Sequence, residues 1–595
     1  MTAPFLCTTA LSEFWDFNAK KILFLGQWCL RYDRQSEWEN LDYEVLPYLW
    51  DDRDAMHRAA EYEKKVYEAL LHAVSDLINA VHREYHGDRY WRMILGPWLL
   101  HYVQVMHERF MCLRTAFERY HECRTIGLSE QSFRIPRDFE DYILGSIADP
   151  YNLQLYTSLL KAMGMDVHLR DYHWEWDGFT KKSSLLGGLM EIAGSLKKKM
   201  SCRWAMNKEI LMVDMYMPRK KFAEFLLVAE AKAGVATLPS TRHWTNDYQE
   251  THRHRCRDEF ALLRPAMDDS FLSVLVRTLP HNLPLIYLEG YHSCREWIQK
   301  EWGQSKTRVI LTANALEMND TFKFLAADSV EKGVKMIAIQ HGGSYGTARY
   351  NPNEELESTV SDEFWSWGWR DTKGKNRPMP SPKLSHINAM SAKSVRGNRY
   401  IYYVANIIPR FHYRTWSCPT AGQGLQYLNW QITFIMTLRQ DVRARLIYRP
   451  YQKDYGWNVK KRLVDACSEL QIEDPLGDYF DKLKNATLVV CDMNQSSLLE
   501  CLAANIPVVA FWDPQHWELR QSAEPYYRFL REVKILHNSP QDAACHSNAL
   551  WPDVASWWLD QGVQKARMAF TEQFAYHSPD WASVWYKHLQ YIMTN

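Results

Sequence analysis

The chain has 595 residues, which is too long for one hydrophobic core and predicts two major domains. Lysine and arginine together number 71, as do aspartate and glutamate, so the formal net charge is zero. The protein therefore has no overall electrostatic field that would attract nucleic acid or an anionic membrane. We therefore expect no nucleic-acid partner and a local site for any polyanion.

The cysteines and apolar runs indicate a cytoplasmic location. The 12 cysteines have no repeating spacing, and no cationic and apolar signal segment opens the chain. The longest apolar run near the N-terminus is well short of the roughly 20 residues that cross a bilayer. Tryptophan is abundant at 25 residues, which suits stacking on sugars or bases, contact with a membrane interface, or simply a core rich in tryptophan.

The N-terminal part predicts a strand followed by long helices. Residues 22–30 (ILFLGQWCL) predict a strand that ends at Gly26, where the backbone can turn sharply and line a cleft. Apolar residues at three- and four-residue spacing predict helices over 62–86 and 98–123.

A basic, histidine-rich segment lies at 250–260 (ETHRHRCRDEF) within a mixture of helical patterns and polar loops. His252, His254 and Cys256 have side chains that bind zinc, but arginines alternate with them and repel a cation. We therefore expect a solvated basic loop and no metal site.

After residue 300, short β-rich apolar runs alternate with helical patterns. This rhythm, with strands that are apolar throughout, predicts parallel sheets covered by helices on both faces. A linker is expected at 393–398, between an N-terminal domain with helical insertions at 1–392 and a C-terminal domain at 393–595. The predicted strands are 308–315, 335–342, 400–409, 444–451, 486–493 and 506–513.

Ligands of open parallel sheets bind beyond the carboxyl ends of the strands, so the residues there are the first functional candidates. One predicted strand ends in QHGGSYG. Gly342 and Gly343 let a substrate approach the backbone, and His341 can hold or move a proton near neutral pH. The alternative is a histidine that only caps its own loop.

A second strand end, YRPYQKDYGW, carries Arg449 and Lys453. An arginine held by the following proline suits a phosphate or carboxylate. A surface arginine before proline is also common, so this segment alone is a weak signal.

A third strand end, CDMNQSSLLECLAAN, predicts a phosphate site. Asp492 ends the strand, and Gln495, Ser496 and Ser497 open a helix whose first N–H groups and positive dipole end favour phosphate. Glu500, one turn later, can accept hydroxyl groups of a ribose or sugar. The alternative is an ordinary serine cap of the helix.

These motifs carry a resemblance to known enzymes. Segment 486–513 resembles the nucleotide-binding region of GT-B glycosyltransferases, where a serine pair, a glutamate and a Pro-Val-Ile strand seat donor phosphate and ribose. Arg449-Pro450 stands where enzymes like sialyl- and Kdo-transferases often carry His-Pro. With LGQWCL, ANALEMNDTFKFLAA, IQHGGSYG and SDEFWSWGW, the chain resembles a bacterial family of transferases found with surface-carbohydrate genes.

The resemblance implies an α/β, GT-B-like fold with additional N-terminal helices, in which two Rossmann-like domains face each other across a cleft. The donor would bind the C-terminal domain and the acceptor mainly the N-terminal one, without metal or cofactor. His341 is the expected catalytic base, while Glu357 and Asp362 compete for that role or for a nucleophile's. The expected donor-binding residues are Arg449, Lys453, Asp492, Gln495, Ser496, Ser497 and Glu500.

The resemblance favours a CMP-activated keto-acid sugar of the Kdo or nonulosonate type as donor, with a UDP- or GDP-hexose as the alternative. The expected acceptor is a cell-surface glycan, either free or lipid-linked. A lipid-linked acceptor would bring the protein to the inner face of the membrane. Two other classes stay open: a polyol-phosphate transferase of the teichoic-acid type, and a glycan-binding protein without catalysis.

Overall fold

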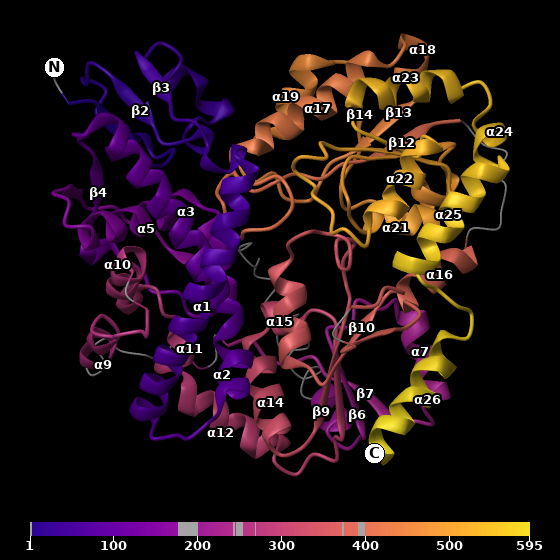
Figure 1. Cartoon of the computed structure of the whole chain (residues 1–595), viewed down its shortest axis with the longest axis horizontal. Helices are drawn as coiled ribbons and strands as arrows, with labels where there is room; N and C mark the ends of the chain where they lie inside the picture. Colours follow the sequence, from indigo (N-terminus) through magenta and orange to yellow (C-terminus); the bar gives the residue numbers. More distant parts are fainter. Residues whose placement is uncertain are drawn as a thin grey trace.

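The computed structural model describes residues 3–176, 200–241, 244, 254–267, 269–371, 374–390 and 399–595. The predicted linker at 393–398 and His252 lie outside the described residues. Two six-stranded parallel sheets dominate the remainder, each with helices on its faces (Figure 1). The GT-B-like α/β fold with additional N-terminal helices is therefore confirmed.

The sheet built from the last third of the chain has the order β14-β13-β12-β15-β16-β17. Counted along the chain this is 3-2-1-4-5-6, the order of dinucleotide-binding Rossmann folds, and the order reverses between β12 and β15. Its strands are β12 (Ile401–Val404), β13 (Leu446–Arg449), β14 (Gln471–Ile472), β15 (Leu488–Cys491), β16 (Val508–Phe511) and β17 (Leu536–His537).

The other large sheet has the order β11-β10-β9-β8-β6-β7, and its order reverses between β6 and β8. Strands β6 and β7 were missed in the sequence, although β6 (ILMV) is apolar and buried throughout. The strands are β6 (Ile210–Val213), β7 (Ala233–Val235), β8 (Val309–Thr312), β9 (Lys335–Ile339), β10 (Glu363–Ser366) and β11 (Asn376–Pro378).

The N-terminal residues form a third unit beside both sheets, drawn in indigo and violet (Figure 1). It contains two small parallel sheets, β1-β2-β3 and β4-β5, and a pair of long helices that pack against each other. The strand predicted at 22–30 is only three residues long, because the chain turns into a short 3-10 helix after Gly26. Its strands are β1 (Phe5–Cys7), β2 (Ile22–Phe24), β3 (Tyr43–Val45), β4 (Ile126–Leu128) and β5 (His168–Arg170).

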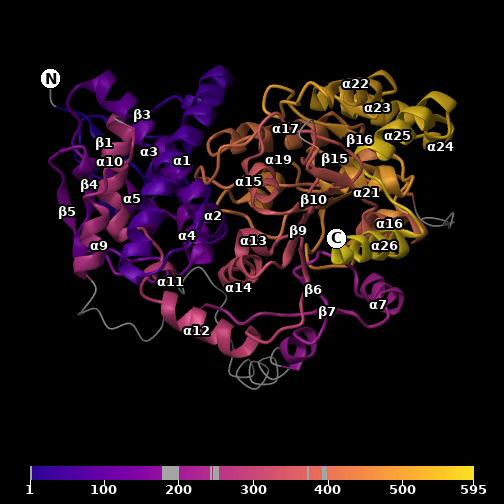
Figure 2. The same ribbon diagram turned by 60° about the horizontal axis from the view of Figure 1, so that its bottom comes forward.

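Helices surround the three units, as seen from a second direction in Figure 2. The two long predicted helices are confirmed as α1 and α3. The helices before β9 are α1 (Arg53–His82), α2 (Asp88–Ile94), α3 (Gly96–Tyr120), α4 (Phe139–Ser146), α5 (Asp149–Ala162), α7 (Arg219–Val228), α9 (His254–Phe260), α10 (Ser270–Thr278), α11 (Leu285–Leu288), α12 (Tyr291–Trp302), α13 (Ala315–Met318) and α14 (Asp320–Glu331).

The helices after β9 cover the C-terminal sheet and the junction. They are α15 (Pro352–Val360), α16 (Pro382–Met390), α17 (Gln423–Thr437), α18 (Gln440–Arg443), α19 (Val459–Ala466), α20 (Tyr479–Asn485), α21 (Ser496–Ala503), α22 (Glu524–Glu532), α23 (Pro540–Leu550), α24 (Val554–Trp558), α25 (Gln561–Phe574) and α26 (Trp581–Thr594).

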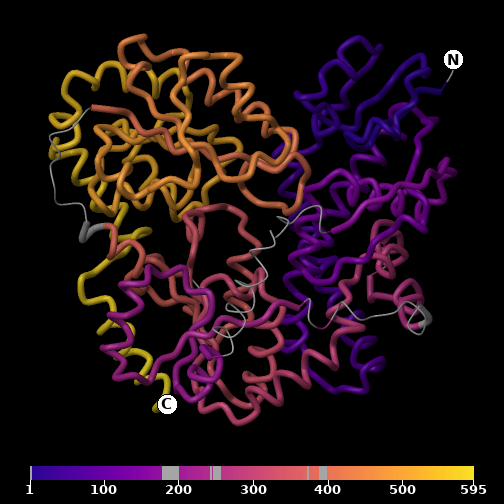
Figure 3. Tube along the Cα trace, turned by 180° about the vertical axis from the view of Figure 1, so that it is seen from behind, coloured from indigo at the N-terminus to yellow at the C-terminus, as the bar shows by residue number. Residues whose placement is uncertain are grey.

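The last helix, α26, packs on the β6–β11 sheet. Trp581 and Trp585 are buried in one cluster with Ile210 and Trp365. In Figure 3 the C-terminal end accordingly runs beside the segments of that sheet. The chain thus crosses from the β6–β11 sheet to the C-terminal sheet and then returns to the β6–β11 sheet.

The loop after β9 holds the two sheets together. Ala348 forms an isolated antiparallel bridge with Leu519, which follows β16. Arg520 donates from its backbone to the Thr347 carbonyl at 2.9 Å and from its guanidinium to Glu354 at 2.9 Å. The segment that begins with the His-Gly-Gly turn is therefore fixed against the C-terminal sheet.

Candidate functional site

The candidate site is a cavity of about 630 Å³ between the carboxyl ends of the two large sheets. On one side it is lined by residues that follow β6, β8 and β9, and on the other by residues that follow β12, β13 and β15. The places where the strand order reverses in both sheets therefore open into the same cavity. Such reversal points are where ligands of open α/β sheets bind.

His341 follows β9 and lines the cavity, as does Gly342. Its Nε2 lies 4.0 Å from Oε2 of Glu317, and its Nδ1 lies 3.9 Å from Oε1 of Glu357. Burial lowers the pKa of His341, although Glu317 acts in the opposite direction. The imidazole is therefore neutral at pH 7 and free to accept a proton.

Glu317, on the short helix after β8, lines the same wall. One oxygen, Oε1, accepts a hydrogen bond from Asn353 at 2.8 Å and lies 3.5 Å from the Arg414 guanidinium. Burial alone would raise the pKa of Glu317, but Arg414 and His341 outweigh it and leave the pKa below its ordinary value. Glu317 is thus an ionised carboxylate with its other oxygen toward the histidine.

Glu357 lies behind the cavity wall and is not among its lining residues. It accepts a hydrogen bond from the Tyr345 hydroxyl at 3.0 Å. Burial, and after it the charge of Glu317, raise the pKa of Glu357 well above its ordinary value. Both effects favour the neutral form of this carboxyl over the ionised one. The competing candidate Asp362 pairs with Arg89 at 2.9 Å.

The opposite wall is the N-terminus of α21, where Gln495, Ser496 and Ser497 line the cavity. The N-cap residue is Gln495, and its side chain makes no capping hydrogen bond. Neither serine is therefore the cap that the alternative interpretation required. The first N–H groups of such a helix have no intrahelical partner and favour an anion.

Gly343 brings the two walls together. A Cβ at this position would overlap the backbone of Gln495, whereas a Cβ at Gly342 would meet only the Tyr345 ring at 3.4 Å. The His-Gly-Gly turn therefore packs directly against the start of α21, and only glycine fits at the second position.

Asp492 and Glu500 lie close in sequence to the start of α21 but do not line the cavity. Asp492 accepts hydrogen bonds from Tyr427 at 2.5 Å and from Gln431 at 2.8 Å. Burial raises its pKa to about 7. Glu500 accepts a hydrogen bond from Tyr479 at 2.6 Å and pairs with Lys383 at 2.5 Å.

The two basic candidates after β13 have different positions. Lys453 lines the cavity, whereas Arg449 does not. Arg449 pairs with Glu473 at 2.6 Å and donates to the Pro475 carbonyl at 2.5 Å. Its guanidinium is thus used within the C-terminal sheet.

Gly26 does not line the cavity either. Its backbone is extended, with φ −175°, and the Trp28 ring occupies the place where a Cβ would be. Trp28 contacts the ring of Phe411, a lining residue, at 6.1 Å between ring centroids. Gly26 is thus two contacts away from the cavity.

The lining residues that sequence reasoning missed include Tyr216, Glu317 and Arg414. Each follows a strand of a large sheet, β6, β8 and β12 respectively. The rule that ligands bind at strand ends could have found Glu317, whose strand was predicted. Arg414 lies ten residues beyond the end of β12 at Val404, so only the folded loop brings it to the cavity.

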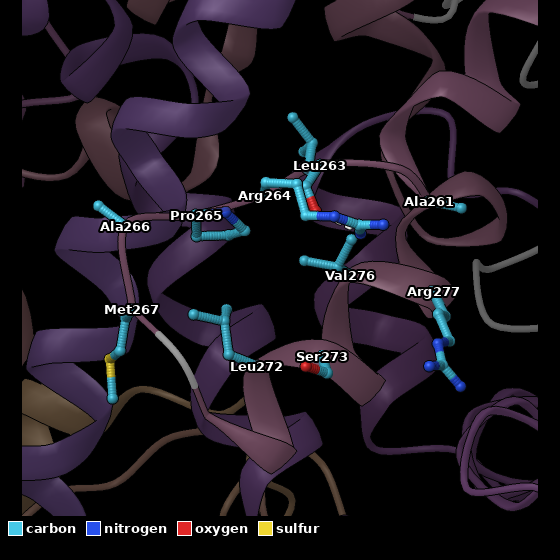
Figure 4. Close-up of a pocket in the computed structure, with 10 residues that line it drawn as sticks. All are labelled: Ala261, Leu263, Arg264, Pro265, Ala266, Met267, Leu272, Ser273, Val276 and Arg277. Atoms are coloured by element: carbon cyan, nitrogen blue, oxygen red, sulfur yellow. Dashed lines mark hydrogen bonds between the residues drawn. The ribbon is translucent and has the colours of Figure 1, made fainter.

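A second hollow, of about 460 Å³, lies between α9 and α10, away from the strand ends (Figure 4). Its wall is apolar apart from Ser273 and two arginines, Arg264 and Arg277. It offers no acid or base for catalysis.

Among the described residues, no group of three or more histidine, cysteine, aspartate or glutamate side chains could hold a metal ion. In the same residues, no helix is long and apolar enough to cross a membrane.

Comparisons with known proteins add a family. The model of the LIC12162 family of transferases matches residues 4–589, nearly the whole chain. No curated protein matches the sequence.

Solved structures match only loosely. MnaA of Staphylococcus aureus with UDP is 11% identical, with a TM-score of 0.38, and the match covers 65% of this chain and 97% of that one. MurG of Acinetobacter baumannii is 12% identical, with a TM-score of 0.33 and coverage of 64% and 99%. A UDP-forming trehalose-phosphate synthase of Burkholderia vietnamiensis is 11% identical, with a TM-score of 0.34 and coverage of 65% and 97%. Similarities this low carry no functional inference.

Proposed function

We propose that this chain, which belongs to the LIC12162 family of transferases, moves a sugar from a nucleotide-sugar donor to a cell-surface glycan. The observation that carries the proposal is the single cavity into which the reversal points of both sheets open. The start of α21 forms one wall of it and His341 stands on the other. A two-substrate transfer needs such a pair of facing walls.

The donor phosphate is placed at the N-terminus of α21. The N–H groups and hydroxyls of Ser496 and Ser497 would hold its oxygens, with Gln495 beside them and Lys453 supplying a positive charge. These groups stabilise the charge that develops on the departing phosphate, so the proposal needs neither metal nor cofactor. In domain terms, the donor belongs to residues 393–595 and the acceptor mainly to residues 1–392.

His341 is the proposed general base. The acceptor hydroxyl loses its proton to the imidazole as its oxygen bonds to the anomeric carbon, while the bond from that carbon to the phosphate oxygen breaks and the nucleotide leaves. Glu317 faces the imidazole and stabilises the cation that forms. Glu357 supports Tyr345 from behind the wall by accepting its hydroxyl proton in a hydrogen bond and takes no part in the proton transfer.

The donor we favour is a CMP-activated keto-acid sugar, on the strength of the resemblance to sialyl- and Kdo-transferases. Two cations at the cavity, Arg414 and Lys453, suit the carboxylate that such a sugar carries. A cytoplasmic location agrees with the 12 cysteines, all of which are unpaired.

The test is the melting temperature of the protein with CMP, CDP, UDP or GDP and no added metal, because a ligand of the folded state raises it by mass action. A rise with CMP that disappears in a Ser496→Ala, Ser497→Ala double variant is expected. A rise with UDP or GDP alone would overturn the donor, and no rise with any nucleotide would overturn the function. If product analysis finds phosphorus transferred to the acceptor, the protein is a polyol-phosphate transferase instead.

A further inference from the structure

Two exposed tyrosines face the cavity, one from each large sheet. Tyr216 follows β6 and is 57% exposed, and Tyr451 follows β13 and is 46% exposed. Both line the cavity. Burial raises the pKa of Tyr216, with Glu317 acting in the same direction and Lys383 in the opposite one.

The backbone under Tyr216 is held in a conformation that a bulky residue rarely adopts. Tyr216 has φ 49° and Asp214 has φ 48°, both in the left-handed region. The Asp214 carbonyl accepts hydrogen bonds from Ala313 at 3.3 Å and from Asn314 at 3.2 Å, after the neighbouring strand. Backbone strain of this kind persists only where surrounding contacts enforce it, and it gathers at binding sites.

The loop that presents Tyr451 is fixed in the same way. Tyr455, whose ring stacks with Tyr451 at 6.0 Å between centroids, has φ 53° and also lines the cavity. The Asp454 carboxylate accepts hydrogen bonds from the backbone of Asn458 at 2.8 Å and Val459 at 2.7 Å. Both exposed rings therefore belong to preorganised loops, and preorganised aromatic faces suit a ligand that stacks.

Some residues that line the cavity also carry buried polar atoms without a partner. Among the described residues, the buried Asn351 Nδ2, Arg414 Nε, Trp416 Nε1 and Trp517 Nε1 have no hydrogen-bond acceptor, and all four residues line the cavity. Unpaired buried donors call for an acceptor-rich ligand or for water. Aromatic faces combined with N–H donors match a sugar ring, which is apolar on its faces and carries oxygens on its rim.

The position of Tyr216 relates this ligand to the acceptor. Its ring lies nearly parallel to that of His341, with 5.9 Å between centroids and 24° between planes. A pyranose stacked on Tyr216 would bring one of its hydroxyl groups to the His341 imidazole. Both residues belong to the wall of the cavity opposite the start of α21. We propose that Tyr216 and Tyr451 form a stacking subsite for an uncharged pyranose of the acceptor glycan. Calling this pyranose part of the acceptor rests on the proposed function. The experiment that detects its binding does not depend on that function.

The experiment measures saturation-transfer NMR signals of methyl glycosides of glucose, galactose, mannose, rhamnose and N-acetylglucosamine on the full chain. At least one glycoside should give ring-proton signals that fall fivefold or more in Tyr216→Ala and in Tyr451→Ala. Signals should survive in Tyr216→Phe and Tyr451→Phe, which keep the ring. The control Tyr85→Ala removes a tyrosine that is 98% exposed and not among the cavity's lining residues.

The subsite is overturned if no glycoside gives a signal, or if the alanine variants leave the signals unchanged. Loss of the glycoside signals on addition of CMP or UDP would also overturn it, because the tyrosines would then hold the nucleotide. Failure of the transferase proposal looks different: no nucleotide raises the melting temperature, while the glycoside signals and their dependence on both tyrosines remain.

Discussion

His341 and Glu317 stand face to face, with 4.0 Å between Nε2 and Oε2, although they follow different strands of the same sheet. The carboxylate keeps its charge because Arg414 lies 3.5 Å from its other oxygen. A neutral imidazole beside an ionised carboxylate is the arrangement that lets a histidine take a proton and remain stable as a cation.

Replacing the histidine tests its role directly. His341→Asn should lower kcat by about 10²- to 10⁴-fold, the usual contribution of a positioned base, with little change in nucleotide affinity. Steady-state kinetics and the melting temperature measure the two effects. The exposed His173 provides a control, His173→Asn, with full activity expected. Wild-type turnover in a folded His341→Asn variant would rule out the base.

The pH profile tests the pairing with Glu317. The base must be deprotonated, so kcat/KM should rise with pH through the pKa of His341, which burial holds below 6.5. Glu317 raises that pKa, so Glu317→Gln should move this rise to lower pH. Arg414 lowers it, so Arg414→Gln should move the rise to higher pH. Shifts in the same direction, or no shift, would contradict the proposed electrostatics.

A pair of glycine variants tests the contact between the two walls. Gly343→Ala should cost about 1–3 kcal/mol of unfolding free energy, the usual range for overpacking, because its Cβ would overlap the Gln495 backbone. Nucleotide binding should weaken with it, since the start of α21 must move. The matched change Gly342→Ala meets an ordinary 3.4 Å contact and should be tolerated. Chemical denaturation and calorimetric titration measure both, and equal costs for the two variants would contradict this packing.

Substitution of the two basic candidates near the end of β13, Lys453 and Arg449, should have different effects on nucleotide affinity. Lys453→Ala removes the cation that lines the cavity and should weaken nucleotide binding about tenfold, as for a lost hydrogen bond to a charged group. Arg449→Ala should leave the affinity within about twofold and lower stability instead, because Glu473, whose side chain is only 7% exposed, loses one of its ion-pair partners and keeps only Lys482. A tenfold loss of nucleotide affinity in Arg449→Ala would show that Arg449 binds the donor after all.

The buried Asp492 predicts a pH-dependent stability. Its pKa rises from 3.8 to about 7 on folding, so the stability it contributes is fully present below pH 3.8 and is lost as pH rises to about 7. Wild type should therefore lose stability relative to Asp492→Asn by about 1.4 kcal/mol per pH unit across that window. Denaturation at several pH values measures the slope. The exposed Asp76 provides the control Asp76→Asn, and an equal slope there would refute the assignment.

Much of the fold and part of the site could be predicted because the signals are local. The apolar runs that predicted six strands coincide with β8, β9, β12, β13, β15 and β16, since a strand buried on both faces must be apolar throughout. The same local logic placed His341 and the Ser496–Ser497 pair at strand ends, and both line the cavity.

What the sequence determined by itself was therefore the parallel-sheet architecture and the location of the ends of six of its strands. The tertiary structure decided which charges remain available there. Glu473 and the Pro475 carbonyl hold the Arg449 guanidinium, and Glu357 is buried behind Tyr345. Glu317 and Arg414 meet only because the loops after β8 and β12 converge. Burial and pairing depend on neighbours distant in the chain, which no local pattern of residues encodes.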